Sequence, residues 1–204
     1  MSADDVNPVA LLSASLRLTA VPAAVAMSRR FVRYHLPRWK MEEHTDAAAL
    51  IASELVTNAV KVSGVLQFNP KPWQITGEHV IAVQLRAIGS GLYVEVWDRI
   101  ESSPVVKHPS LSATNGRGLL LVEQFAMTWN VYRPRVGGKV VWAQLPLERE
   151  VEPPAFEEPF IPLQVPSALR SLPGATDDRA RTALYERLLE TTAAAMRARV
   201  NDAT

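Results

Sequence analysis

The stretch SELVTNAV, residues 53–60, lies inside a segment whose apolar residues recur with the spacing of an α-helix. Five residues of this segment are three or four apart and therefore share one helix face: Ile51, Glu54, Leu55, Asn58 and Val62, of which we expect the apolar ones to be buried. A buried polar group without a partner costs about 1–3 kcal/mol, so we expect Glu54 and Asn58 to meet something polar. The alternative is a helix that is apolar all round, with Glu54 reaching solvent at one edge.

Glu54 and Asn58 offer a carboxylate and an amide oxygen one helical turn apart. Magnesium is a hard cation that takes oxygen ligands and keeps several waters. A neighbouring carboxylate can polarise an attacking hydroxyl or water. This pair therefore suits a magnesium ion beside an activated hydroxyl or water molecule.

The composition of the 204-residue chain excludes several classes of function. With 22 basic and 21 acidic residues, it gives no electrostatic case for a nucleic-acid surface. The absence of cysteine excludes a disulfide framework and any thiolate metal site. No apolar run reaches the about 18 residues of a membrane span, and the N-terminal stretch is acidic where a signal peptide is basic. We expect a soluble cytoplasmic protein with neither membrane nor nucleic acid as a partner.

Hydrophobic periods and turn residues predict an α+β chain. The predicted elements are a strand within 13–22, helices over 23–39 and 45–63, strands over 79–88 and 92–98, a helix over 116–127, strands over 128–134 and 139–147, and a helix over 176–200. Thr19 or a neighbouring residue could cap the first helix, and Thr45 or Asp46 the second. The exposed side of the first helix is basic, through Arg29, Arg30, Arg33, Arg38 and Lys40, which indicates a solvated face or a dock for an acidic protein.

Two further segments suit a nucleotide. Asp98 ends the apolar face of the strand LYVEVWD, where an acceptor-only carboxylate could receive the exocyclic amine of adenine. As an alternative, aspartate is common at strand ends because it starts turns. Gly116 and Gly118 precede an apolar helix, so backbone amides there could approach an anion. A plain helix start is the other interpretation.

The order and spacing of these features are more specific than any one of them. E-L-V-T-N-A on a helix, a strand ending in Asp98, a polar loop over 99–115, GRGLLLV, and a hairpin with GGK follow one another. This pattern resembles the ATP-binding fold shared by gyrase, Hsp90, histidine kinases and MutL, and within it the anti-sigma-factor serine/threonine kinases of actinobacteria. The resemblance implies a two-layer α+β sandwich over 14–147, with a mixed or antiparallel sheet and helices on one face.

Carried over residue by residue, the resemblance implies Glu54 as the general base and Asn58 as the Mg²⁺ ligand. Asp98 would bind the adenine amine, and loop 99–115 would form a lid. The segment contacting the phosphates of ATP would be Gly116, Arg117, Gly118 and Leu119. Lys139 could meet a phosphate or simply sit in a turn.

The function that the resemblance implies is an ATP-dependent serine/threonine protein kinase acting in transcription control. Its partners would be a sigma factor, an anti-sigma antagonist, or both, and a homodimer is a further option. The alternative is a non-catalytic ATP-binding adaptor that uses nucleotide to switch partner binding. Glu54 favours the enzyme, whereas Ile100, at a position where the superfamily usually has glycine, favours the adaptor. A third interpretation is an interaction protein with an empty pocket.

Three segments lie outside the predicted ATP-binding domain: an N-terminal arm (1–13), a proline-rich linker or strap (148–175) and a C-terminal helix (176–204). The C-terminal helix has an apolar period through Ala180, Leu184, Leu188 and Met196. If Asp98 faces the nucleotide, the opposite sheet face exposes Tyr93, Trp97, Tyr132 and Trp142, which together need a cover. We expect the strap to supply it through Phe156, Phe160, Ile161, Leu163 and Val165, with the last helix adding contacts within or between chains.

Overall fold

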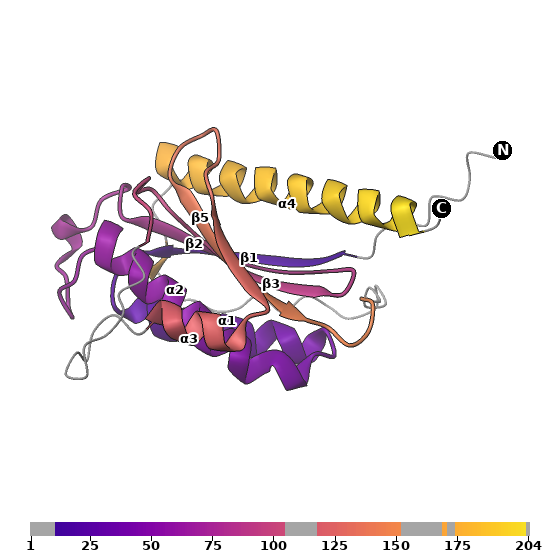
Figure 1. Ribbon diagram of the computed structural model, residues 1–204. Helices are drawn as coiled ribbons and strands as arrows, with labels where there is room; N and C mark the ends of the chain where they lie inside the picture. Colours follow the sequence, from indigo (N-terminus) through magenta and orange to yellow (C-terminus); the bar gives the residue numbers. More distant parts are fainter. Residues whose placement is uncertain (1–10, 105–117, 152–168, 171–173, 203–204) are drawn as a thin grey trace.

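The computed structural model describes residues 11–104, 118–151, 169–170 and 174–202. Within these ranges the chain forms a five-stranded sheet in the order β1–β2–β3–β5–β4, and each neighbouring pair is antiparallel (Figure 1). The strands are β1 (Leu11–Thr19), β2 (Val80–Ile88), β3 (Gly91–Asp98), β4 (Thr128–Tyr132) and β5 (Lys139–Pro146). The α+β class is therefore confirmed, and the sheet, expected to be mixed or antiparallel, is antiparallel.

Three helices cover one face of this sheet (Figure 1). They are α1 (Ala23–Arg38), α2 (Thr45–Ser63) and α3 (Gly118–Phe125). Two short 3₁₀ turns, η1 (Glu42–His44) and η2 (Pro72–Gln74), precede α2 and β2. The apolar sides of the three helices and of the sheet form one core, in which Phe31, Ile51 and Val94 are almost completely buried.

Both long helices of this layer begin without the side-chain caps that we expected from Thr19 and from Thr45 or Asp46. The reason at α2 is that η1 leads directly into it, so the chain is already helical where a cap would stand. The ends were predicted closely, because α1 ends at Arg38 after Pro37 and α2 ends at Ser63 before Gly64. The basic residues of α1 are exposed, as expected.

The buried side of α2 is centred on Ala52 and Val56, which pack toward the sheet and α1. Glu54 and Asn58 project from another part of the helix surface and are half-buried. The side chain of Val62 is 51% exposed, so our expectation that it would be buried with this segment is wrong. In the last helical turn the buried residues are Ala59, Val60 and Ser63, and Val62 lies outside this buried side.

The other sheet face is covered by α4 (Ala175–Asp202), which runs along the sheet opposite α1–α3 (Figure 1). Ala180, Ala183 and Leu184 of α4 pack with Trp97 and with valine and alanine side chains of β2 and β5. The C-terminal extension is thus a third layer. The strap residues that we expected to supply this cover, from Phe156 to Val165, lie outside the described residues.

The period that we assigned to α4 holds for its first half only. Ala180 and Leu184 are buried and Leu188 is half-buried, but Met196 is 43% exposed. A spacing of four residues exceeds the helical repeat of about 3.6 at each step, so a line of such residues drifts around the helix. The expectation that Met196 would join the buried side is therefore wrong.

Contacts near the start of α4 tie it to the first and second strands. Arg17 of β1 forms an ion pair with Asp177, and the Thr176 hydroxyl donates a hydrogen bond to Glu78 at 3.1 Å. The Thr19 hydroxyl donates to the backbone carbonyl of Arg170 at 3.1 Å. Among the described residues, no helix combines the length and the apolar character needed to cross a membrane.

Candidate functional site

Glu54 lies against the beginning of α3. A Cβ atom placed on Gly118, the first residue of α3, would lie 2.5 Å from Oε2 of Glu54. A side chain at position 118 would have to displace this carboxylate, and the contact places Glu54 beside the end of the helix where backbone N–H groups are free. The structure therefore brings together two residues that the sequence analysis selected from different segments.

Asn58 lies one turn after Glu54 on α2 and is half-buried. Its amide oxygen and the carboxylate of Glu54 form an all-oxygen donor pair, which is the chemistry that Mg²⁺ prefers. Among the described residues, no group of three or more histidine, aspartate and glutamate side chains could hold a metal by itself. A magnesium ion here would need further oxygen atoms from a ligand or water.

Asp98, at the end of β3, is buried and pairs with Lys139 at the start of β5. The Lys139 ammonium donates to Oδ1 of Asp98 at 2.8 Å and to the carbonyl of Ile100 at 2.7 Å. The Ile100 N–H also donates to Oδ1, at 2.9 Å. Burial raises the pKa of Asp98, and the hydrogen bond and charge of Lys139 oppose this rise. Lys139 therefore does not sit in a turn but forms a buried ion pair.

Asp98 and Lys139 face the α1–α3 side of the sheet. They are opposite each other in the register of β3 and β5, and the next pair on the same side, Val96 and Val141, belongs to the α1–α3 core. Because α2 packs against both β3 and α3, the Asp98 pair and the Glu54–Gly118 contact belong to the same layer. Oδ2 of Asp98 accepts no hydrogen bond from the described part of the chain.

Two glycines close the turn between β4 and β5. Gly137 and Gly138 have φ of +89° and +77°, a backbone region that strongly favours glycine. A Cβ atom on Gly138 would also collide with the carbonyl oxygen of Asp98. The GGK sequence therefore lets the β5 strand begin directly beside Asp98, which brings Lys139 to the carboxylate.

The remaining predicted site residues divide into two groups. Gly116 and Arg117 lie outside the described residues. Leu119 is buried in the core of the α1–α3 layer, so only its backbone is available to a ligand. Sequence reasoning missed the pairing of Lys139 with Asp98, although the two strand ends that carry them were both predicted, and their register would have revealed it.

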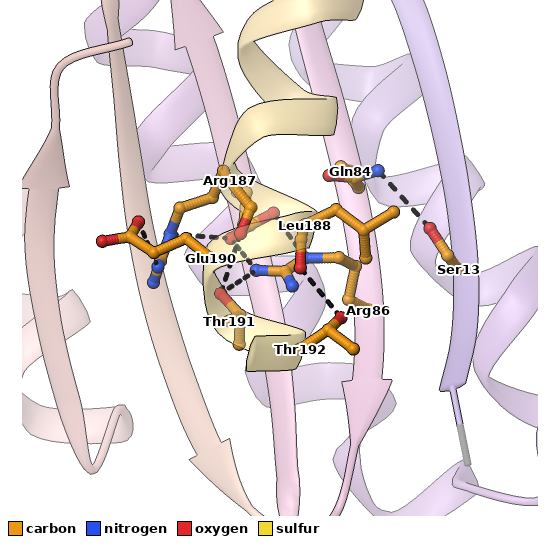
Figure 2. Close-up of polar contacts among 9 residues, drawn as sticks. Ser13, Gln84, Arg86, Arg187, Leu188, Glu190, Thr191 and Thr192 are labelled. Atoms are coloured by element: carbon orange, nitrogen blue, oxygen red, sulfur yellow. Dashed lines mark hydrogen bonds and ion pairs between the residues drawn. The ribbon is translucent and has the colours of Figure 1, made fainter. Parts of the chain in front are cut away.

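A second polar cluster lies under α4 (Figure 2). Arg86 of β2 and Glu95 of β3 form a completely buried ion pair, with Arg86 Nε donating to Glu95 at 2.8 Å. Arg86 also donates to the Thr191 hydroxyl of α4 at 3.1 Å, and Arg187 Nε lies 3.4 Å from Glu95 without hydrogen-bond geometry. One carboxylate thus holds two guanidinium groups, one from the sheet and one from α4.

Aromatic rings surround the guanidinium group of Arg187. Its central carbon lies 4.4 Å from the ring centre of Trp142 and 5.8 Å from that of Tyr132. The Tyr93 ring contacts Trp142 and lies 5.2 Å from the Arg86 guanidinium. The prediction that Tyr93, Tyr132, Trp142 and Trp97 share the outer face is confirmed, and α4 covers them by cation–π contacts as well as by apolar packing.

Neither the models of protein families nor the curated protein sequences contain a match to this chain, so these comparisons assign it to no family.

Proposed function

We propose that this chain binds ATP with Mg²⁺ beside the α2–α3 junction and transfers the γ-phosphoryl group to a serine or threonine of a partner protein. The partner would act in transcription control, as for an anti-sigma-factor-like kinase. One observation carries this proposal. Glu54 sits against a glycine at the N-terminal end of α3, with Asn58 one turn away. Because residue 118 is a glycine, no side chain fills the space beside the Glu54 carboxylate.

The donor set suits a metal-bound triphosphate. Asn58 would hold Mg²⁺, which supplies charge neutralisation to the phosphates when bound. Backbone N–H groups at the start of α3 would meet phosphate oxygens. Glu54 would take the proton of the substrate hydroxyl while that oxygen bonds to the γ-phosphorus. The bond to the bridging oxygen then breaks, and ADP leaves with the electron pair.

Asp98 would recognise the adenine ring. Its Oδ1 is held by Lys139 and by the backbone of Ile100, so Oδ2 is the oxygen left to accept the exocyclic amine. This arrangement would fix the carboxylate in one orientation and keep it ionised when the amine donates.

The second candidate function is the non-catalytic ATP-binding adaptor. The buried Asp98–Lys139 pair favours it, because this pair ties the end of β3, proposed to bind adenine, to β5, and this link requires no phosphate transfer. In an adaptor, nucleotide occupancy would change partner affinity while the phosphates stay intact.

Nucleotide binding is tested by calorimetry on the full chain with ATP and with GTP, each with and without Mg²⁺. We expect Mg²⁺-dependent binding of ATP, no comparable binding of GTP, and weaker ATP binding by the Asp98→Asn variant. A wild-type chain that binds neither nucleotide would overturn both candidate functions and leave the interaction protein with an empty pocket.

Catalysis is tested by ADP release and transfer of labelled γ-phosphate to a library of serine and threonine peptides. Glu54→Ala should keep ATP binding and lose transfer, whereas Glu42→Ala, at an exposed position of η1, should behave as wild type. Transfer by Glu54→Ala at the wild-type rate would refute the assigned base. Binding without transfer in the wild type would favour the adaptor.

A further inference from the structure

A helix that covers a sheet usually buries its apolar side chains and exposes its polar ones, but α4 does the reverse at several positions. Its sheet-facing side buries the polar residues Asp177, Arg187 and Thr191 beside small and apolar ones. Its outward side exposes three large apolar side chains: Tyr185 at 57%, Leu189 at 52% and Met196 at 43%. A helix on the surface of a monomer normally turns such residues inward.

These three residues form one line along the helix, which we call the α4 stripe. Leu189 follows Tyr185 by four residues and Met196 follows Leu189 by seven, spacings that keep side chains on one side. At about 1.5 Å per residue the stripe is roughly 16 Å long. The three side chains of the stripe are exposed, and α4 lies on the sheet face opposite α1–α3 (Figure 1), so a partner could reach the stripe without touching the candidate nucleotide site.

The charges beside the α4 stripe indicate what would cover it. Glu186, whose Oε2 also accepts the Arg135 N–H at 3.1 Å, flanks the Tyr185 end, and Arg197 flanks the Met196 end on the same side of the helix. A second α4 running antiparallel brings Tyr185 of one helix to Met196 of the other and Glu186 close to Arg197. A parallel copy would leave these opposite charges roughly 16 Å apart along the axis. On the other flank, Arg181 already pairs with Asp178 of its own helix at 2.8 Å.

We propose that α4 pairs antiparallel with α4 of a second copy of this chain through the α4 stripe. The two-fold axis would pass between Leu189 and Thr192, so that each stripe covers the other. The contact involves about three helical turns per chain and is therefore smaller than the about 800 Å² per partner of a standard interface. The resulting dimer is reversible and depends on protein concentration.

The oligomeric state is tested by sedimentation equilibrium at rising concentration. Wild type should form dimers, and Leu189→Lys should raise the dissociation constant about tenfold or more, because it puts a charge in the centre of an apolar contact. The matched control is Phe68→Lys, which changes a side chain that is 91% exposed in the loop after α2 and should leave dimerisation unchanged. A wild type that stays monomeric into the millimolar range overturns the proposal, as does a dimer weakened by Phe68→Lys and not by Leu189→Lys.

The orientation of the two helices is tested by disulfide trapping. Only the introduced cysteines can react, because the chain has no cysteine of its own. A mixture of Tyr185→Cys and Met196→Cys chains should form the mixed disulfide under mild oxidation, and each variant alone should form much less. Efficient homodisulfides of each variant alone would show a parallel pair and overturn the antiparallel assignment. Circular dichroism melting of each variant checks that α4 remains folded.

Discussion

Glu54 and Gly118 are close neighbours across the junction of α2 and α3, so close that a methyl group on Gly118 would approach Oε2 of Glu54 to 2.5 Å. The two residues are distant in sequence, and neither needs the other for its own helix. Their contact fixes where the carboxylate lies relative to the free N–H groups of α3. The glycine therefore controls the position of the proposed base.

Gly118→Ala should displace the Glu54 carboxylate and lower phosphate transfer more than it lowers ATP affinity. The added methyl group must push a flexible side-chain end aside, so the stability cost should stay near 1 kcal/mol. Gly77→Ala is the control, because a Cβ atom there meets nothing within 4 Å. Steady-state transfer kinetics and urea unfolding measure both effects. Equal transfer rates for Gly118→Ala and wild type would show that the contact does not position a base.

Lys139→Met should destabilise the fold by about 3–5 kcal/mol, because it leaves the buried carboxylate of Asp98 without its cation. Burial already raises the pKa of Asp98, and loss of Lys139 should raise this pKa further. A carboxyl group whose pKa is higher in the folded than in the unfolded protein stabilises the fold at low pH. This stabilisation is lost as the pH rises. The difference in unfolding free energy between wild type and variant should therefore narrow from pH 7 toward pH 4. A difference that is constant over this range would contradict the assignment.

Glu95→Gln should loosen α4, since it removes the charge that holds both Arg86 and Arg187, leaving the buried Arg86 guanidinium uncompensated and Arg187 with Glu190 as its remaining carboxylate. We expect a loss of about 3–5 kcal/mol and faster amide hydrogen exchange in α4. Arg181→Ala, which breaks an exposed pair on the same helix, should change stability by no more than about 0.5 kcal/mol. Unchanged exchange in α4 of Glu95→Gln would mean that apolar packing alone holds the helix.

Ending the chain after Val151 should make the protein prone to aggregation. Val151 itself belongs to the α1–α3 core, so it is kept, but the truncation removes α4 and uncovers Trp97 and the aromatic rings around Trp142. Light scattering and binding of a hydrophobic dye should both rise. A truncated chain that stays clear and melts like the full chain would show that the outer face tolerates water.

His35 should make the fold sensitive to mild acid. Its ring is buried among Phe31, Tyr34 and Trp39, and burial together with the charge of Arg38 lowers its pKa to about 4. Because the pKa is lowered, the stability contributed by the neutral ring is complete above about pH 6.5 and is lost toward pH 4. This loss is on the order of 3 kcal/mol at most.

The check on His35 is urea unfolding of wild type and of His35→Leu between pH 7 and pH 4. The wild type should lose more unfolding free energy over this interval than the variant, while His79→Gln, in the loop before β2, should follow wild type. Parallel curves for wild type and His35→Leu would show that the His35 ring becomes protonated without cost.

Local signals predicted most of the fold. Proline at position 22, the apolar period to Arg38, and Gly64 after Ser63 defined α1 and α2, because helices depend on neighbours along the chain. The hairpin of β2 and β3 followed from alternating residues around a short glycine turn. The burial of β2 on both faces was not predicted, since it depends on α4 packing from far away in the sequence.

The candidate site was predictable only in part. Glu54, Asn58 and Asp98 could be selected because polar residues interrupt apolar faces at recognisable positions. The partners of these residues depend on register and packing, so the sequence did not reveal that Lys139 meets Asp98. Arg86 and Glu95 were equally visible as charges in apolar strands, but their link to Arg187 spans two layers of the fold.

The position of α4 in the chain has a consequence for protein synthesis. All five strands of the sheet have been synthesised once β5 is made. Its aromatic outer face, however, can be covered only after the synthesis of α4, which ends at Asp202. Translation at roughly 5–20 residues per second leaves that face uncovered for several seconds on every ribosome. During this interval the nascent chain exposes Trp97 to solvent, which favours recognition by chaperones that bind exposed aromatic surface.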